Sequence, residues 1–303
     1  MRLSFYLPKR TSRHDSKAGL MKAFASGVRA SGDEVVDAVS ATTDHSQMDA
    51  FLTWNGLKNQ MKPIADAYKA AGKKVVILET PLMNRDVDPR DYASGRLGIN
   101  HIVYSYGDFN IPESAGPERF EKLGIELLPW RKKGDHIVIA MQLSDDTSIC
   151  GVDFFAWIEN CIKQLREHTS RPIVLKSHPM IESNLNHPVR AMEAARLQDM
   201  STRLNFEIFK SNLDDSRFDL LDNCWAVVCL TTGLAIDCVI RGIPVIATHP
   251  GNFMYPIQSN EILEIENPRM GDRQPWFNRL AYAQWSIEEA ESGVAWRHIK
   301  QAI

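Results

Sequence analysis

Short apolar runs alternate with amphipathic stretches along most of this chain, and this alternation restricts its fold more than any other feature. The segment Asn59–Ala71 has helical spacing and ends at Gly72, and the nearly continuous β-type run Lys74–Glu79 follows it. Strands that alternate with helices in this way form parallel sheets with helices on both faces. In the first half we expect strands at Arg2–Leu7, Glu34–Val39, Ala50–Thr53, Lys74–Glu79 and His101–Ser105.

The alternation stops between Gly107 and Gly134, where prolines and glycines are frequent, and then starts again. In the second half we expect strands at His136–Met141, Pro172–Lys176, Phe206–Phe209, Trp225–Leu230 and Pro244–Ala247. The sequence therefore predicts an α/β protein with two Rossmann-like, doubly wound domains that face a cleft, with ligand bound at the carboxyl ends of the strands. The expected domains are residues 1–130 and 131–275, followed by helices at 276–303 that pack across the cleft.

Composition and motifs exclude several other classes. Of the 303 residues, 44% are hydrophobic and 24% are charged, which is ordinary for a globular protein. No apolar run approaches the roughly 18 residues that span a bilayer, and the first residues lack a signal-peptide core, so we expect a cytoplasmic protein. Cysteines and histidines show no CxxC, HxH or HExxH spacing, which argues against a bound metal. The GxGxxG, GxxxxGKS/T and GxSxG patterns are also absent, which disfavours dinucleotide, NTPase and esterase chemistry.

The loop Lys176-Ser177-His178-Pro179 follows directly after an apolar strand. A lysine and a histidine at the carboxyl end of a strand supply hydrogen-bond donors to an anion, and Pro179 restricts the turn. A plain turn with a solvated lysine is the alternative.

The loop Leu230-Thr231-Thr232-Gly233 lies between a buried strand and a helix. Hydroxyls and free backbone N–H groups at such a position suit a phosphate, and Gly233 permits a close approach. Ordinary capping of the helix by threonine is the alternative. Asp237, one turn into the helix, could accept from a ribose hydroxyl or complement the helix dipole.

Together these two loops carry a resemblance. A strand followed by Lys-x-His-Pro, and later a strand, Thr-Thr-Gly, a helix and Arg-Gly-Ile-Pro-Val, resembles the donor half of GT-B glycosyltransferases, in particular the branch that transfers capsular-polysaccharide sugars, sialic acid or glycerophosphate. The resemblance covers about residues 135–250 and implies a nucleotide-sugar co-substrate, of UDP or CMP type, with no essential metal. It implies that Lys176 and His178 contact the donor phosphates, and that Thr231 and Thr232 bind the leaving group.

An inverting transferase needs a carboxylate that deprotonates the acceptor hydroxyl. In the first half, three acidic residues at or after strand ends are candidates: Asp15, Glu79 and Asp108. Asp15 could equally cap the helix that begins near Ser16. The residues leave the choice open, with Asp15 slightly favoured.

Basic residues are concentrated in the loop after the first strand, at Lys9, Arg10, Arg13 and His14. They could hold the phosphates of DNA or an anionic glycan, or form a solvated loop. Trp54, at a nearby strand end, could stack on a sugar or on an extruded base, or belong to the core.

The acceptor is therefore open at this stage. The basic loop and the compact length make the chain similar overall to bacteriophage enzymes that glycosylate hydroxymethylated pyrimidines in DNA, so modified DNA in the host cytoplasm is the acceptor we expect. The overall acidity, with a pI of about 6.3, counts against DNA. A capsular or surface polysaccharide is the second acceptor, although no basic amphipathic membrane-binding helix is evident. A non-catalytic nucleotide-sugar-binding protein and an epimerase remain as further alternatives.

Overall fold

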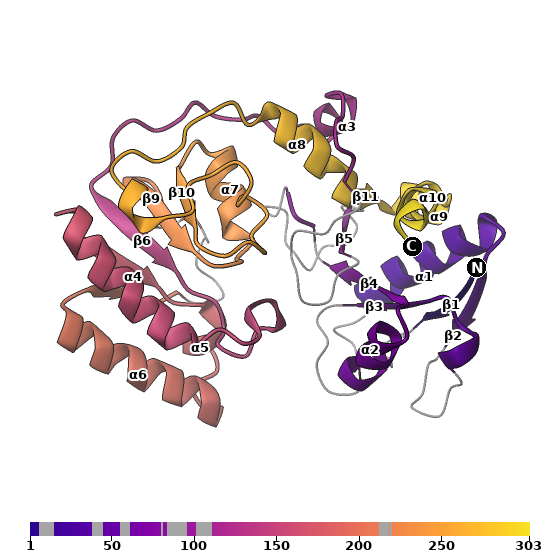
Figure 1. The fold of residues 1–303 in the computed structure, drawn as a ribbon, viewed down its shortest axis with the longest axis horizontal. Helices are drawn as coiled ribbons and strands as arrows, with labels where there is room; N and C mark the ends of the chain where they lie inside the picture. Colours follow the sequence, from indigo (N-terminus) through magenta and orange to yellow (C-terminus); the bar gives the residue numbers. More distant parts are fainter. Residues whose placement is uncertain are drawn as a thin grey trace. The chain divides into compact units, whose positions relative to one another are not determined.

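The structure is a computed structural model, and it describes residues 1–5, 15–37, 45–54, 61–79, 81–83, 96–100, 111–211, 218 and 220–303. The chain divides into two compact units (Figure 1). Unit 1 contains Met1–Ile125 and Gln274–Ile303, and unit 2 contains Glu126–Arg273. The C-terminal segment thus belongs to the same unit as the N-terminal part of the chain.

Unit 1 is built on a sheet with the strand order β11-β5-β4-β3-β1-β2. Its strands are β1 (Arg2–Phe5), β2 (Glu34–Asp37), β3 (Ala50–Trp54), β4 (Lys74–Glu79), β5 (Arg96–Asn100) and β11 (Gln284–Ser286). The first four strands pair in parallel, as the alternating sequence predicts. β5, however, runs antiparallel to both of its neighbours. The local sequence pattern does not predict this antiparallel pairing, because β11 comes from the far end of the chain. The expected strand His101–Ser105 lies outside the described residues.

Helices cover both faces of this sheet. The described helices are α1 (Asp15–Ala30), α2 (Met61–Ala70), α3 (Glu118–Glu121), α8 (Gln274–Leu280), α9 (Ile287–Glu291) and α10 (Val294–Ile299), with short 3-10 turns η1 (His45–Gln47), η5 (Ala281–Ala283) and η6 (Lys300–Ala302). α2 buries Tyr68 against Phe51, with ring centroids 5.5 Å apart. On the other face α1, α9 and α10 share one core, in which Trp296 meets Phe24 edge-on at 6.2 Å.

The close contact between α1 and α9 depends on a glycine. A Cβ atom added at Gly27 would lie 1.9 Å from the carbonyl oxygen of Ala290, which no side chain can occupy. The two helix backbones therefore touch at Gly27, and this contact holds α9 against α1 within unit 1.

Unit 2 is built on a parallel sheet with the strand order β10-β9-β6-β7-β8. Its strands are β6 (His136–Ala140), β7 (Ile173–Lys176), β8 (Glu207–Phe209), β9 (Cys224–Cys229) and β10 (Val245–Ala247). The chain starts in the middle of the sheet, runs outward to β8, and returns to β9 on the other side of β6. This is the doubly wound order that the sequence predicts.

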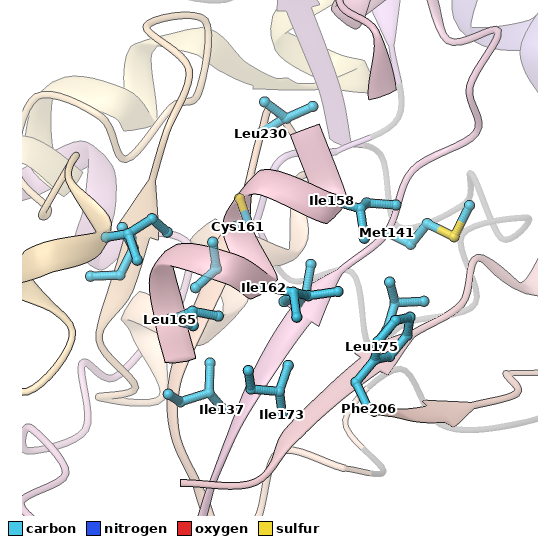
Figure 2. Close-up of a cluster of buried hydrophobic side chains, with 14 of the residues drawn as sticks. Ile137, Met141, Ile158, Cys161, Ile162, Leu165, Ile173, Leu175, Phe206 and Leu230 are labelled. Carbon is cyan, nitrogen blue, oxygen red and sulfur yellow. The ribbon is translucent and has the colours of Figure 1, made fainter. Parts of the chain in front are cut away.

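The helices of unit 2 are α4 (Phe154–His168), α5 (Pro179–Glu182), α6 (Pro188–Leu204) and α7 (Leu234–Ile240), with 3-10 turns η3 (Thr147–Ile149) and η4 (Ile262–Glu264). Asp153 caps α4 by accepting from the Ala156 N–H. The apolar face of α4 lies on the sheet, where Ile158, Ile162 and Leu165 meet Ile137 and Ile173 (Figure 2). None of the described helices is long and apolar enough to cross a membrane.

Candidate functional site

The strand order of unit 2 marks a candidate site. The chain leaves β6 toward β7 on one side, and β9 flanks β6 on the other, so the strand order reverses between β6 and β9. Ligands of doubly wound folds bind at this reversal, outside the carboxyl ends of the strands. We call this side of the sheet the carboxyl edge. The segments that begin there are 141–149 after β6, 177–179 after β7 and 230–233 after β9.

A buried hydrogen-bond network joins two of these segments. The Thr231 N–H donates to Gln142 Oε1 at 2.9 Å, and Gln142 Nε2 donates to Thr231 Oγ1 at 2.9 Å. The hydroxyls of Ser148 and Thr231 lie 2.7 Å apart. All three residues are at most 5% exposed. The network therefore fixes the ends of β6 and β9 to each other, and it occupies the hydroxyl of Thr231.

The neighbouring Thr232 is placed differently. It is half-buried, and its hydroxyl accepts a hydrogen bond from the Leu234 N–H at 3.3 Å. Gly233 is the N-cap residue of the seven-residue helix α7 and has an ordinary φ of −63°, and Asp237 is buried within that helix. Of the two threonines, Thr232 is the one whose side chain is accessible to a ligand.

His178 follows β7 and caps the short helix α5. Its Nδ1 accepts a hydrogen bond from the Met180 N–H at 3.2 Å, so the proton of the neutral ring resides on Nε2. Burial lowers the pKa of His178, although the carboxylate of Asp146 acts in the opposite direction. At neutral pH the side chain is therefore an uncharged hydrogen-bond donor at the carboxyl edge.

Lys176, the last residue of β7, is buried. Its Nζ donates to Ser211 Oγ at 2.8 Å and lies 4.7 Å from the centre of the Phe209 ring. Because Ser211 follows β8, this contact ties the ends of β7 and β8 together. Lys176 thus places a positive charge at the carboxyl edge in a fixed, buried position, and its side chain does not extend freely into solvent.

An ion cluster that sequence reasoning missed holds the loop after β6. Arg190 donates to Glu193 Oε2 at 2.7 Å and to Asp145 Oδ1 at 2.6 Å. The other oxygen of Glu193 accepts from the Ser144 N–H at 2.9 Å, and Glu193 is completely buried. The polar run after the strand, from Gln142 to Asp146, could have drawn attention to this loop. Its partners on α6 could not be found, because they are 45 or more residues away in the sequence.

The candidates of the first half are placed only in part. Glu79 ends β4 and is half-buried, and Trp54 ends the adjacent strand β3, so both lie at the carboxyl edge of the unit 1 sheet. Asp15 is the first residue of α1. The remaining candidates, which lie outside the described residues, are Lys9, Arg10, Arg13, His14 and Asp108.

The described part of the chain contains no group of three or more His, Cys, Asp or Glu side chains that could hold a metal ion.

No protein-family model and no curated protein matches this chain. Among solved structures, it is similar to KpsC of Thermosulfurimonas dismutans, a beta Kdo 2,7 transferase, with a TM-score of 0.52 and 17% identity over 97% of this chain and 99% of that one. Weaker similarity is found to UDP-GlcNAc 2-epimerase of Methanocaldococcus jannaschii in complex with UDP-GlcNAc and UDP (TM-score 0.40, 10% identity, 97% and 98% covered). MurG of Acinetobacter baumannii gives a TM-score of 0.31 at 10% identity, with 100% and 98% covered. The likeness to KpsC shows the fold, and the two-unit, Rossmann-like GT-B class expected from the sequence is confirmed.

Proposed function

We propose that this protein is a glycosyltransferase that takes a sugar from a nucleotide-activated donor bound at the carboxyl edge of unit 2. The observation that carries the proposal is the Gln142–Ser148–Thr231 network, which ties the ends of β6 and β9 together at the strand-order reversal. Around it stand a neutral histidine donor, an accessible threonine hydroxyl and a buried ammonium group, which together suit the phosphate of a nucleotide. The likeness of the fold to a Kdo transferase supports the same reaction class.

The chemistry follows from the charge that develops during transfer. As the bond from sugar to phosphate breaks, negative charge accumulates on the leaving nucleotide, and preorganised donors stabilise it. The Nε2–H of His178 and the hydroxyl of Thr232 would donate to phosphate oxygens. Lys176 would add positive charge through its fixed position at the end of β7. Asp237 is buried in α7, so we now favour its structural role over the ribose contact.

The acceptor hydroxyl loses its proton to a base, and Asp15, Glu79 and Asp108 remain the proposed candidates. Replacing the true base by its amide (Asp15→Asn, Glu79→Gln or Asp108→Asn) should lower turnover strongly and leave donor affinity unchanged, because the base acts only on the acceptor.

A saccharide is the acceptor that the likeness to a Kdo transferase favours. A hydroxymethylated pyrimidine in phage DNA is the second acceptor, and it rests on the basic residues Lys9, Arg10, Arg13 and His14 and on Trp54. If DNA is the acceptor, replacing Arg10 and Arg13 by alanine should lower the affinity for DNA and weaken the dependence of that affinity on salt concentration.

A nucleotide-release assay tests the proposal. The protein is incubated with UDP-N-acetylglucosamine, UDP-glucose, CMP-N-acetylneuraminate and CMP-Kdo, each alone, with capsular oligosaccharides, and with DNA that contains hydroxymethylcytosine or hydroxymethyluracil. Release that requires one acceptor supports the transferase and identifies the acceptor. Conversion of the sugar without any acceptor would instead identify an epimerase, and binding without turnover a binding protein.

Two variants of His178 test whether this side chain contacts the donor phosphates. Asparagine keeps an acceptor for the Met180 N–H but has no group at the Nε2 position, so His178→Asn should retain the fold and weaken nucleotide binding. Glutamine places an amide N–H near that position and should restore part of the affinity. Unchanged nucleotide affinity in His178→Asn would contradict the phosphate role.

A further inference from the structure

A second histidine-proline turn lies at the same edge of unit 2. His249-Pro250 follows β10 as His178-Pro179 follows β7. In both turns the Nδ1 of the histidine accepts the N–H of the residue two positions later, from Met180 at 3.2 Å and from Gly251 at 3.0 Å. The two rings are therefore held in the same tautomer by the same local hydrogen bond.

The second turn is firmly attached to the end of β9. Asn252, which is 1% exposed, donates to the carbonyl oxygen of Leu230 at 2.6 Å and accepts from the Met254 N–H at 2.8 Å. Thr248 donates its N–H to Cys229 at 3.0 Å and accepts from the indole N–H of Trp157 at 2.9 Å. Since Leu230 directly precedes Thr231, the turn has a fixed position beside the proposed phosphate-binding loop.

The outer nitrogen of His249 is not used by the fold. The ring is half-buried, and its Nε2 has no hydrogen-bond partner among the residues that the structure describes. Burial lowers the pKa of His249, so the ring is neutral at pH 7 and Nε2 carries a proton. A rigid, uncharged N–H donor without an internal partner is suited to a hydroxyl or carboxylate of a ligand.

The strand order decides which part of the donor this histidine can reach. Along the carboxyl edge the strands follow in the order β7, β6, β9, β10, so the ends of β7 and β10, which the two histidine-proline turns follow, lie three strand spacings apart, or about 14 Å. The phosphate is proposed between β7 and β9, and His249 lies beyond it. Beyond β7, at the end of β8, lies the half-buried aromatic ring of Phe209, which contacts Lys176 Nζ and is an apolar group that suits a base. The β10 side offers Thr248 and His249, which are polar.

We propose that His249 donates a hydrogen bond to the sugar that is transferred, and so contributes to the choice of donor sugar. This inference rests on the proposed function, since it requires a nucleotide sugar at the carboxyl edge. His249 is a sugar-binding residue in this account, with no proton transferred to or from it.

The test compares sugar-bearing and free nucleotides on paired variants. His249→Asn keeps an acceptor for the Gly251 N–H and removes the Nε2–H donor, whereas His249→Gln restores a donor near that position. His168→Gln, on the exposed last turn of α4, is the matched control. Calorimetry measures affinity for the four nucleotide sugars of the release assay and for free UDP and CMP, and thermal unfolding checks the fold.

We expect His249→Asn to bind its nucleotide sugar about tenfold more weakly, as for the loss of one hydrogen bond, while affinity for the free nucleotide stays the same. His249→Gln should recover part of the loss. Equal losses for the sugar-bearing and free nucleotides would overturn the inference, because His249 would then contact the nucleotide. Unchanged affinities would also overturn it and leave His249 as a turn residue. Failure of the wild-type protein to bind any nucleotide would refute the proposed function itself.

Discussion

Each unit contains an ion cluster built around a buried carboxylate, Asp33 in unit 1 and Glu193 in unit 2, and the two clusters lie at different edges of their sheets. In unit 1 the carboxylate of Asp33, 3% exposed, accepts from Lys300 Nζ at 2.8 Å and from the Trp296 indole at 2.7 Å, and also contacts the amine of Met1. In unit 2 Glu193 and Arg190 form a pair in which both side chains are buried, whereas Lys300 in unit 1 is 39% exposed. In both clusters a buried carboxylate pairs with a basic group, but the two clusters hold different parts of their units.

The difference lies in what each cluster holds. Asp33 directly precedes β2, at the amino edge of its sheet, and its partners bring α10 and η6 onto that edge. Glu193 and Arg190 hold Ser144 and Asp145, which follow β6 at the carboxyl edge of the other sheet. Ligands bind at carboxyl edges in doubly wound folds. We therefore expect the Asp33 cluster to contribute to stability alone, and the Glu193 cluster to contribute to stability and donor binding together.

The largest effect is expected from Glu193→Ala. It leaves the buried guanidinium of Arg190 with Asp145 as its remaining acidic partner, which should lower the free energy of unfolding by about 3–5 kcal/mol. Urea unfolding measures this loss. The double variant Arg190→Met/Glu193→Leu removes both charges and should recover most of the stability, but not nucleotide affinity, because Ser144 remains unanchored. Full recovery of both would show that the cluster does not position the loop.

Asp33→Asn should lower the free energy of unfolding by about 2 kcal/mol without a change in nucleotide affinity. Burial alone would raise the pKa of Asp33, but hydrogen bonds from Lys300, the N-terminal amine and Trp296 outweigh it and lower the pKa from 3.8 to about 2. This difference sets the size of the stabilisation. Denaturation and calorimetry on the same sample measure both quantities. A loss of nucleotide affinity in the folded variant would remove the distinction between the two edges.

The stability that Asp33 contributes should also depend on pH. A carboxyl group whose pKa is lower in the folded state stabilises the fold above its unfolded pKa, and this stabilisation disappears as the pH falls through the folded value. The advantage of the wild-type protein over Asp33→Asn should therefore be complete at pH 5 and fall to about half by pH 3. Urea midpoints at pH 5, 4 and 3 measure this trend. A constant difference would mean that Asp33 is not the group that titrates.

Local sequence patterns predicted the parallel strands and the loops after them, because apolar runs and helical spacing are properties of neighbouring residues. Lys176 and Thr231 were predicted as site residues from these loops, and that role stays a prediction. Their actual partners, Ser211 and Gln142, depend on strand order, which no local pattern contains. The same holds for Glu193 and for the antiparallel pairing of β5 with β11, since each contact joins distant parts of the chain.

The smallest effects separate the two adjacent threonines. Thr231→Val should lower the free energy of unfolding by about 1 kcal/mol, because Gln142 and Ser148 lose a buried partner. Thr232→Val should change stability by less than about 0.5 kcal/mol, since the side chain is half-buried and its hydroxyl, within the described part of the chain, accepts only a long hydrogen bond from the Leu234 N–H. Nucleotide affinity should fall several-fold in Thr232→Val if its hydroxyl donates to the phosphate. If Thr231→Val alone lost affinity, the network rather than an accessible hydroxyl would be what the phosphate requires. The carboxyl edge would then act on the donor through its backbone geometry.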